Sequence, residues 1–154
     1  MTNLTTSFAG KVNSKLVLDP TLVVEKEGRY FLLNKDLKSV ARQDFFYAGK
    51  YLGKMKKGKF FPSFNLLAML AEAEANKVVV DEKAAWLFIC GRDILSERIT
   101  AVHGSRRKGD FTLVLNGFGE CLGFGRILHD LSSKDINAAI RNVSDVGDFL
   151  RRER

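Results

Sequence analysis

Basic side chains carry the chemistry that this sequence offers, and the densest cluster of them spans residues 50–59. The segment reads KYLGKMKKGK and holds five lysines, two glycines and no acidic residue. Lysine ammonium groups bind phosphates and glycines let the backbone bend, so we predict a flexible phosphate-binding loop with Lys54, Lys56 and Lys57 as RNA contacts. The alternative is a solvated hairpin turn. Flanking aromatic rings could stack on unpaired bases or belong to the core; they are Tyr47, Tyr51, Phe60 and Phe61.

Two arginine-rich segments offer another kind of phosphate contact. The first is a predicted loop between two strands, where paired guanidinium groups can each form two hydrogen bonds to phosphate; the alternative is a solvated turn without a ligand. The second is the last turn of a predicted C-terminal helix, where cations also stabilise the helix end, so part of their role is structural. The candidate RNA-binding residues are Arg106, Arg107 and Lys108 in the loop, and Arg151, Arg152 and Arg154 at the C-terminus.

A glycine turn at residues 91–93 supplies one further candidate, Arg92. In the functional interpretation, the turn presents backbone amides and Arg92 to RNA. In the structural interpretation, Asp93 pairs with Arg92 or with a neighbouring backbone amide. Sequence alone slightly favours the structural interpretation.

The charge of the whole chain agrees with a polyanionic partner. The 154 residues carry a formal net charge of +7, with a pI of about 9.5. Such an excess attracts nucleic acid over long distances, although it also aids solubility. The 45% share of hydrophobic residues is enough for a folded core and excludes a wholly disordered chain.

Catalytic and metal-binding patterns are missing from the sequence. The sequence contains no nucleophile near a general base, no paired carboxylates and no glycine-rich phosphate-binding motif at the spacing that such sites require. Cys90, Cys121, His103 and His129 match no metal-ligand spacing, and the two cysteines are expected to behave as small hydrophobic residues. We therefore predict a protein that is not an enzyme and has no cofactor, no bound metal and no small-molecule substrate.

Residues 77–154 predict a β-rich module that would position three of the basic clusters. Val78–Val80 suits a strand, and residues 82–90 suit a short, almost fully buried helix that includes Trp86 and ends at Gly91 with positive φ. Strands at 111–115 and 120–128 flank Asn116-Gly117, a hairpin signal. A closing strand at 138–143 precedes a helix capped by Ser144.

Residues 1–76 mix strand and helix patterns. We expect strands at 15–18, 21–24 and 29–33, with a turn at Glu27-Gly28. Helices are expected at 36–47 and at 64–75, the second capped by Ser63, although residues 45–49 could equally begin a strand. The apolar face of that second helix would consist of Phe64, Leu67, Ala68 and Ala71.

The pattern changes near residue 76, where a helical stretch gives way to β-branched residues. We therefore predict an α+β fold with a small mixed α/β domain at 1–76 and a β-rich domain at 77–154. No apolar run is long enough for a membrane span and the N-terminus does not resemble a secretory signal, so a cytoplasmic protein is expected.

Two stretches resemble known families. Residues 86–95, WLFICGRDIL, are similar to the helix-and-turn pattern of PUA domains, small RNA-binding barrels named after pseudouridine synthases and archaeosine transglycosylases. Residues 122–125, LGFG, followed by residues 145–151, DVGDFLR, resemble the C-terminal signature of the Nip-seven family of ribosome-biogenesis factors. The likeness covers nearly the whole chain and is strongest over 77–154.

The resemblance implies an α/β domain joined to a PUA-type pseudo-barrel, without catalytic activity. It implies binding to uridine-rich or structured RNA, a role in large-subunit rRNA maturation, and ribosome-assembly or RNA-processing proteins as partners. Arg151 and Arg152 match the basic positions to which RNA contacts are attributed in the archaeal branch. Two alternatives remain: a PUA-containing translation initiation or recycling factor of the MCT type, and a protein-interaction adaptor without RNA contact.

Overall fold

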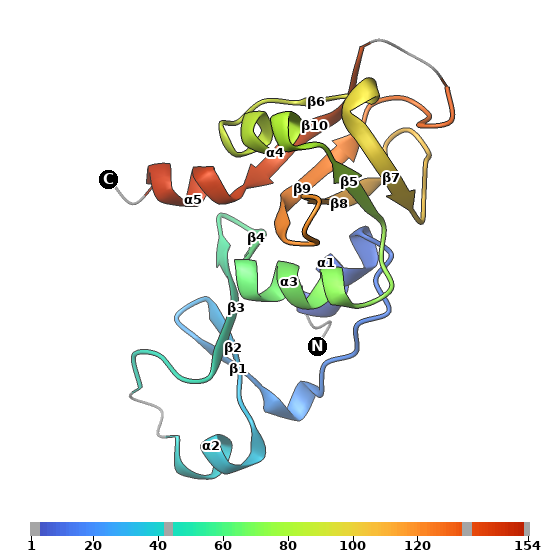
Figure 1. The fold of residues 1–154 in the computed structure, drawn as a ribbon. Helices are drawn as coiled ribbons and strands as arrows, with labels where there is room; N and C mark the ends of the chain where they lie inside the picture. Colours follow the sequence, from blue (N-terminus) through green and yellow to red (C-terminus); the bar gives the residue numbers. More distant parts are fainter. Residues whose placement is uncertain (1–3, 42–44, 134–136, 153–154) are drawn as a thin grey trace.

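The computed structural model describes residues 4–41, 45–133 and 137–152, and contains two β-sheets with helices packed against them (Figure 1). Residues 23–62 supply the strands of a four-stranded sheet, and residues 77–145 supply those of a six-stranded sheet. This mixture of helices and strands confirms the predicted α+β class. The division into domains 1–76 and 77–154 stays a prediction.

The four-stranded sheet is antiparallel throughout, in the order β1 (Val23–Lys26), β2 (Arg29–Leu32), β3 (Lys50–Lys56) and β4 (Lys59–Pro62). Two-residue turns at Glu27-Gly28 and Lys57-Gly58 join β1 to β2 and β3 to β4. All four turn residues have positive φ, between 50° and 75°, as the tightest hairpin turns require. The turn predicted at Glu27-Gly28 is therefore confirmed.

For residues 50–59 the structure confirms the alternative, a hairpin, and the predicted flexible loop is wrong, because the segment forms the paired strands β3 and β4. Apolar residues are interleaved with its lysines and give it a face that packs against the core. Leu52 on that hairpin is completely buried. Four of the five lysines are thus carried on two paired strands and Lys57 on the turn between them, which fixes their spacing.

The strand predicted at residues 15–18 is also wrong. The segment is irregular: Val17 is 87% exposed, and the amide of Lys15 donates to the carbonyl of Glu74 at 2.9 Å. Leu16 and Leu18 pack against the core without a neighbouring strand. The strand predicted at 21–24 begins later, because a 3₁₀ turn, η1 (Pro20–Leu22), capped by Asp19, precedes β1.

Two short helices lie in the first forty residues. The sequence reasoning did not predict α1 (Leu4–Lys11), whose Phe8 and Ala9 are buried. Asn34 caps α2 (Lys35–Val40), which is shorter than the predicted helix 36–47. The helix ends early because the rings of Phe45 and Tyr47 pack around Phe31 at centroid distances of 5.6 and 5.3 Å, and no helix forms there.

Helix α3 (Phe64–Glu72) confirms the predicted Ser63 cap, since Ser63 Oγ accepts a hydrogen bond from the amide of Leu66 at 3.2 Å. The predicted apolar face needs correction, because Ala68 is exposed and Phe64 only half-buried. The helix also ends three residues early. Its buried stripe consists of Leu66, Leu67, Leu70 and Ala71.

The six-stranded sheet has the order β6-β10-β9-β8-β5-β7 and confirms the predicted C-terminal strands. Only the β5–β8 pair is parallel. The hairpin predicted at Asn116-Gly117 exists, but its turn is longer than two residues and uses Gly119 at φ +81°. The strands are β5 (Lys77–Val80), β6 (Ile94–Leu95), β7 (Ile99–His103), β8 (Phe111–Leu115), β9 (Cys121–Ile127) and β10 (Ala138–Asp145), with a 3₁₀ turn η2 (Ser96–Arg98) before β7.

Helix α4 (Glu82–Ile89) covers one side of this sheet (Figure 1) and ends as predicted at Gly91. Gly91 has φ +90°, and its amide donates to the carbonyl of Phe88 at 2.9 Å. The predicted burial of the whole helix is wrong. Only Ala84 and Phe88 are buried, whereas Trp86 is 66% exposed, because a helix on the outside of a sheet buries one face alone.

Helix α5 (Val146–Arg152) follows β10 directly. Its N-terminal cap is Asp145 rather than the predicted Ser144: Asp145 Oδ1 accepts a hydrogen bond from the amide of Asp148 at 2.7 Å. Ser144 remains in β10, opposite Phe124 of β9. None of the described helices is long and apolar enough to cross a membrane.

One hydrophobic cluster joins the two sheets. It combines Phe8 of α1, Leu52 of β3 and Leu66 of α3 with Leu113 of β8 and Phe124 of β9, all buried. A second cluster, centred on Phe88 and Ile140, lies between α4 and the six-stranded sheet. The shared cluster fixes the β3–β4 hairpin relative to the six-stranded sheet, and this relation positions the candidate site.

Candidate nucleic-acid interface

The β3–β4 hairpin has a charged side and an apolar side. Lys54, Lys56 and Lys57 are exposed. Met55 pairs directly with Phe60 across the hairpin, and both are half-buried. Because successive strand residues point to opposite faces, Met55 and Phe60 face away from Lys54 and Lys56.

A groove of about 570 Å³ lies along the apolar side of this hairpin. Its walls come from α1, the β3–β4 hairpin and strands β8, β9 and β10. The charged side chains that line it are Lys11 and Lys59, and no acidic residue among the described ones does so. Five phenylalanines contribute to the lining: Phe8, Phe60, Phe61, Phe111 and Phe124.

Two cations lie over one of these rings. Lys11 Nζ is 5.9 Å and the Arg126 guanidinium carbon 5.8 Å from the centroid of Phe111. Arg126 Nε also donates to the carbonyl of Gly109 at 3.1 Å, which places the β7–β8 loop beside this end of the groove. Lys11 and Arg126 were not among the predicted site residues.

Arg151 lies in a hydrogen-bonded network at the start of α5. Its Nη2 is 3.3 Å from Oδ2 of Asp145, and its Nη1 donates to the carbonyl of Ile89, at the end of α4, at 2.9 Å. Asn142 donates from Nδ2 to the carbonyl of Phe88 at 2.8 Å and to Asp145 Oδ2 at 3.0 Å. Half of the Arg151 side chain remains accessible to solvent.

The turn after α4 shows the structural role considered for Asp93. Asp93 Oδ1 accepts a hydrogen bond from the amide of Asn142 at 2.8 Å, so the turn is tied to β10. Arg92 beside it is exposed. A Cβ built on Gly91 would lie 3.5 Å from Arg151 Nη2, so the Arg92 turn and Arg151 adjoin each other.

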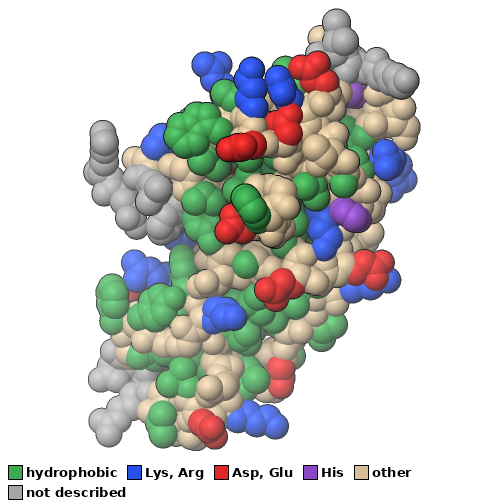
Figure 2. Space-filling model, in the orientation of Figure 1, with side chains coloured by type: hydrophobic (Ala, Val, Ile, Leu, Met, Phe, Trp, Pro, Cys, Tyr) green, Lys and Arg blue, Asp and Glu red, His purple; other side chains and the backbone are tan. Residues whose placement is uncertain are grey.

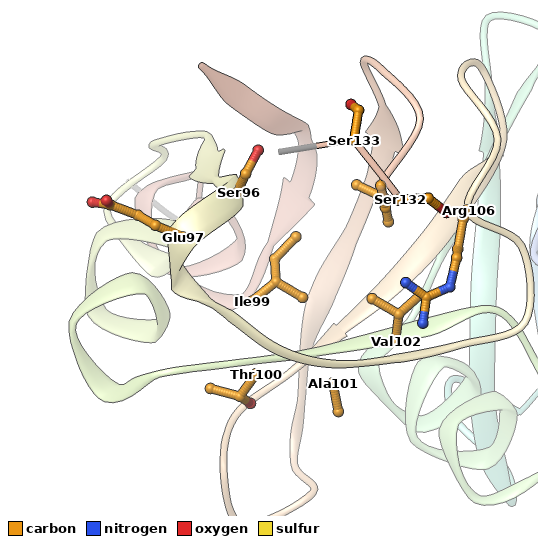
Figure 3. Close-up of a pocket in the computed structure, with 10 residues that line it drawn as sticks. Ser96, Glu97, Ile99, Thr100, Ala101, Val102, Arg106, Ser132 and Ser133 are labelled. Atoms are coloured by element: carbon orange, nitrogen blue, oxygen red, sulfur yellow. The ribbon is translucent and has the colours of Figure 1, made fainter. Parts of the chain in front are cut away.

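A different hollow, of about 690 Å³, lies beside β7, and Figure 3 shows the Arg106 side chain reaching down its wall toward Val102. Ser132, Ser133 and Glu97 also line it. Glu97 makes this hollow less suited to an anion than the groove beside the hairpin. Arg107, next in sequence, is exposed and lies with Nε 3.6 Å from Asp110 Oδ2.

A serine and a histidine meet close to this hollow: Ser96 Oγ is 3.2 Å from His129 Nε2. The sequence reasoning missed this pair. Among the described residues, His129 Nδ1 faces the backbone carbonyl of Asp130 at 3.1 Å and Ser133 Oγ at 3.4 Å, rather than the carboxylate that orients the histidine of a catalytic triad. Over the described part of the chain, no group of three or more His, Cys, Asp or Glu side chains could hold a metal ion.

The two cysteines differ in their surroundings. Cys90 is exposed at the end of α4, so the expectation that it behaves as a small core residue is wrong. Cys121 is partly buried at the start of β9, and burial raises the pKa of its thiol to about 11. Neither cysteine lines the groove.

The structure brings some of the predicted basic residues together and separates others. Lys59 lines the groove, whereas the predicted contacts Lys54, Lys56 and Lys57 belong to the same hairpin but do not line it. The lining continues to Val143 and Ser144 of β10. Lysine, arginine and acidic side chains are intermixed on the face shown in Figure 2, so no single basic patch covers it. Arg106 lines the separate hollow. Arg154 and the side chain of Arg152 lie outside the described residues.

A six-stranded sheet carrying α4 and its glycine turn defines the class of the C-terminal half as a PUA module, and PUA domains commonly bind RNA. The model of the family described as UPF0113 PUA domain matches residues 76–154, and the chain belongs to this family. Among curated proteins, none matches this chain.

Solved structures with similar folds include three archaeal proteins. A conserved PUA domain protein from Thermoplasma acidophilum is 22% identical, with a TM-score of 0.63 over 96% of this chain and 89% of that one. A hypothetical protein from Pyrococcus horikoshii OT3 is 22% identical, with a TM-score of 0.56 over 85% and 77%. A PUA domain from Aeropyrum pernix K1, solved as a tartrate complex, is 23% identical, with a TM-score of 0.51 over 60% and 55%. These likenesses concern the fold alone.

Proposed function

We propose that this protein is a non-catalytic RNA-binding protein of the Nip-seven type that serves large-subunit rRNA maturation. In this role it binds uridine-rich or structured RNA and acts together with ribosome-assembly or RNA-processing proteins. Membership of a PUA domain family supports the RNA-binding part of the proposal. The resemblance of residues 122–125 and 145–151 to the Nip-seven signature supports the ribosomal part.

The observation that carries the RNA-binding proposal is the charge around the groove. Lys11 and Lys59 line it, Lys54 and Lys56 are exposed on the other face of the same hairpin, and no described acidic residue lines the groove. Cations in such an arrangement attract a phosphate backbone, and the release of counterions from RNA supplies most of the binding free energy. Arg92 and the exposed half of Arg151 extend the same contact beyond β10.

The test compares two double variants with equal loss of charge. Lys56→Gln with Lys57→Gln alters the hairpin tip, and Lys35→Gln with Lys38→Gln alters α2, at the other end of the four-stranded sheet (Figure 1). Fluorescence anisotropy with labelled uridine-rich and adenosine-rich single strands, at low and near-physiological salt, measures the affinity. The hairpin variant should reduce the slope of log affinity against log salt by about 1.4, because each phosphate contact contributes about 0.7.

The α2 variant should retain the affinity and salt slope of the unaltered protein. Equal losses in both variants would mean that net charge alone attracts RNA, and the proposed interface would be wrong. No binding of the unaltered protein to either RNA would contradict the function itself and favour a protein adaptor.

A further inference from the structure

We propose that the groove between α1, the β3–β4 hairpin and the six-stranded sheet holds one unpaired base of a single-stranded RNA. The proposal rests on the proposed RNA-binding function and adds what the groove would recognise. The flanking phosphates would lie on Lys11 of α1 and Lys59 of β4, which both line the groove. Such a site would discriminate single-stranded from duplex RNA, because a base within a duplex cannot enter it.

The size and lining of the groove suit a flat aromatic ligand. Its volume of about 570 Å³ lies in the usual range of small-molecule sites. Phe60 and Phe111 are both half-buried, so part of each ring remains accessible. Phe60 is already held by Tyr30, at a centroid distance of 6.0 Å, and by Phe8, at 6.2 Å. A ring fixed in this way can stack on a base without first losing conformational freedom.

Charge complementarity identifies RNA as the occupant. Lys11 and Lys59 are exposed, and Lys11 and Arg126 lie 5.9 and 5.8 Å, respectively, from the centre of the Phe111 ring. An apolar peptide would need no such cations, and an acidic peptide would place carboxylates near the phenylalanine rings. A nucleotide combines an aromatic face with an adjacent negative charge, as these walls do.

Ser7 on α1 offers a position at which the groove can be closed without altering the core. Ser7 is exposed and lines the groove, whereas Thr6, its neighbour, is exposed and does not line it. Ser7→Trp should fill the space meant for the base, and Thr6→Trp is the matched control. Stacking of one base is worth roughly tenfold or more in affinity, so Ser7→Trp should weaken binding of a short oligouridine by about that factor.

Photo-crosslinking of the unaltered protein gives an independent answer. A short oligouridine with one 5-iodouridine, a base that crosslinks to aromatic side chains on which it stacks, is irradiated in the complex. The crosslinked peptides should contain Phe60 or Phe111. The crosslinked positions test the base site even if Ser7→Trp fails to fold.

The outcomes separate the two proposals. Salt-sensitive RNA binding with equal affinities in Ser7→Trp and Thr6→Trp, and crosslinks only outside the groove, would overturn the base site while leaving the RNA-binding function intact. If the unaltered protein binds no RNA, both proposals fail. Capture of apolar peptides in place of RNA would also overturn the base site.

Discussion

Arg151 and Asp145 form an ion pair in which one partner is buried and the other is half-exposed. Arg151 Nη2 is 3.3 Å from Asp145 Oδ2, and the side chains are 49% and 3% exposed, respectively. The same guanidinium donates to the carbonyl of Ile89, so one side chain links β10, α4 and α5. Arg151 therefore stabilises the fold in addition to its proposed contact with RNA.

Replacing Arg151 with alanine should destabilise the protein by about 1–3 kcal/mol, because a buried carboxylate loses a charged hydrogen-bond donor. A charge that served only the helix end would be worth about 0.3–1 kcal/mol. Urea unfolding curves measure the difference. Arg141→Ala, at an exposed position on β10, is the control and should change stability little. Equal effects of the two variants would rule out a structural role for Arg151.

Gly147→Ala should disrupt the start of α5. A Cβ at this position would lie 1.9 Å from the carbonyl oxygen of Ile89, and a backbone atom cannot move away without a large cost in free energy. We expect a loss of about 1–3 kcal/mol or more, as in other overpacked sites. Gly117→Ala has no atom within 4 Å of the added Cβ and should be close to neutral. Thermal unfolding followed by circular dichroism compares the two.

Trp86→Ala should leave the C-terminal module folded, with a change within about 0.5 kcal/mol, because the side chain is 66% exposed. Phe88→Ala, two residues further along α4, removes a completely buried ring and should cost about 3–5 kcal/mol. Unfolding in guanidinium chloride gives both values. A larger loss for Trp86 than for Phe88 would contradict the described orientation of α4.

The two thiols should react at very different rates. At neutral pH the exposed Cys90 should react quickly with a thiol-specific disulfide reagent, whereas Cys121 should react only after the protein unfolds. The reason is that thiolate is the reactive form, and burial keeps the Cys121 thiol protonated. Labelling of native Cys90→Ser should therefore be slow, and rapid labelling of that variant would show that Cys121 is accessible.

The raised pKa of Cys121 also predicts a dependence of stability on pH. The thiol of the unfolded chain ionises near pH 9.0, and that of the folded protein near pH 11. Between these values the folded state holds a proton that the unfolded state has lost, so this thiol makes stability fall by up to about 1.4 kcal/mol per pH unit. The difference in unfolding free energy between the unaltered protein and Cys121→Ala should change over this interval and stay constant below it.

Local signals in the sequence predicted local structure well. Ser63 caps α3 and Gly91 ends α4 as expected, because a cap or a left-handed residue acts on neighbours within one helical turn. The strand predicted at residues 15–18 is wrong, although Leu16, Val17 and Leu18 form a continuous apolar run. A strand requires a neighbouring strand, and within the described ranges none lies beside this segment.

Exposure was harder to predict than secondary structure. Trp86 and Cys90 belong to an apolar stretch, but the six-stranded sheet covers only one face of α4. The N-terminal cap of α5 could have been predicted from the sequence. An aspartate followed by another acidic residue three positions later, here Asp145 and Asp148, is a helix-start signal.

The candidate site was predicted only in pieces. The lysines of the hairpin were found from composition, but the groove depends on contacts between α1, the hairpin and β8–β10, which are far apart in sequence. Lys11 was not predicted as a site residue because α1, the helix that carries it, was not predicted. Ser96 and His129 meet across 33 positions, a separation that spacing rules do not address.

Phe8, Leu52 and Phe124 come from α1, β3 and β9, yet they share one buried cluster. A chain cut between α3 and β5 would expose apolar side chains on both fragments, so the two halves should melt together in one cooperative transition. In evolutionary terms, we expect a shared core of this kind to keep the hairpin and the PUA sheet together. Recombination that moved the C-terminal half alone would separate the two sets of side chains that form this core, and it would leave the groove without the walls from α1 and the hairpin.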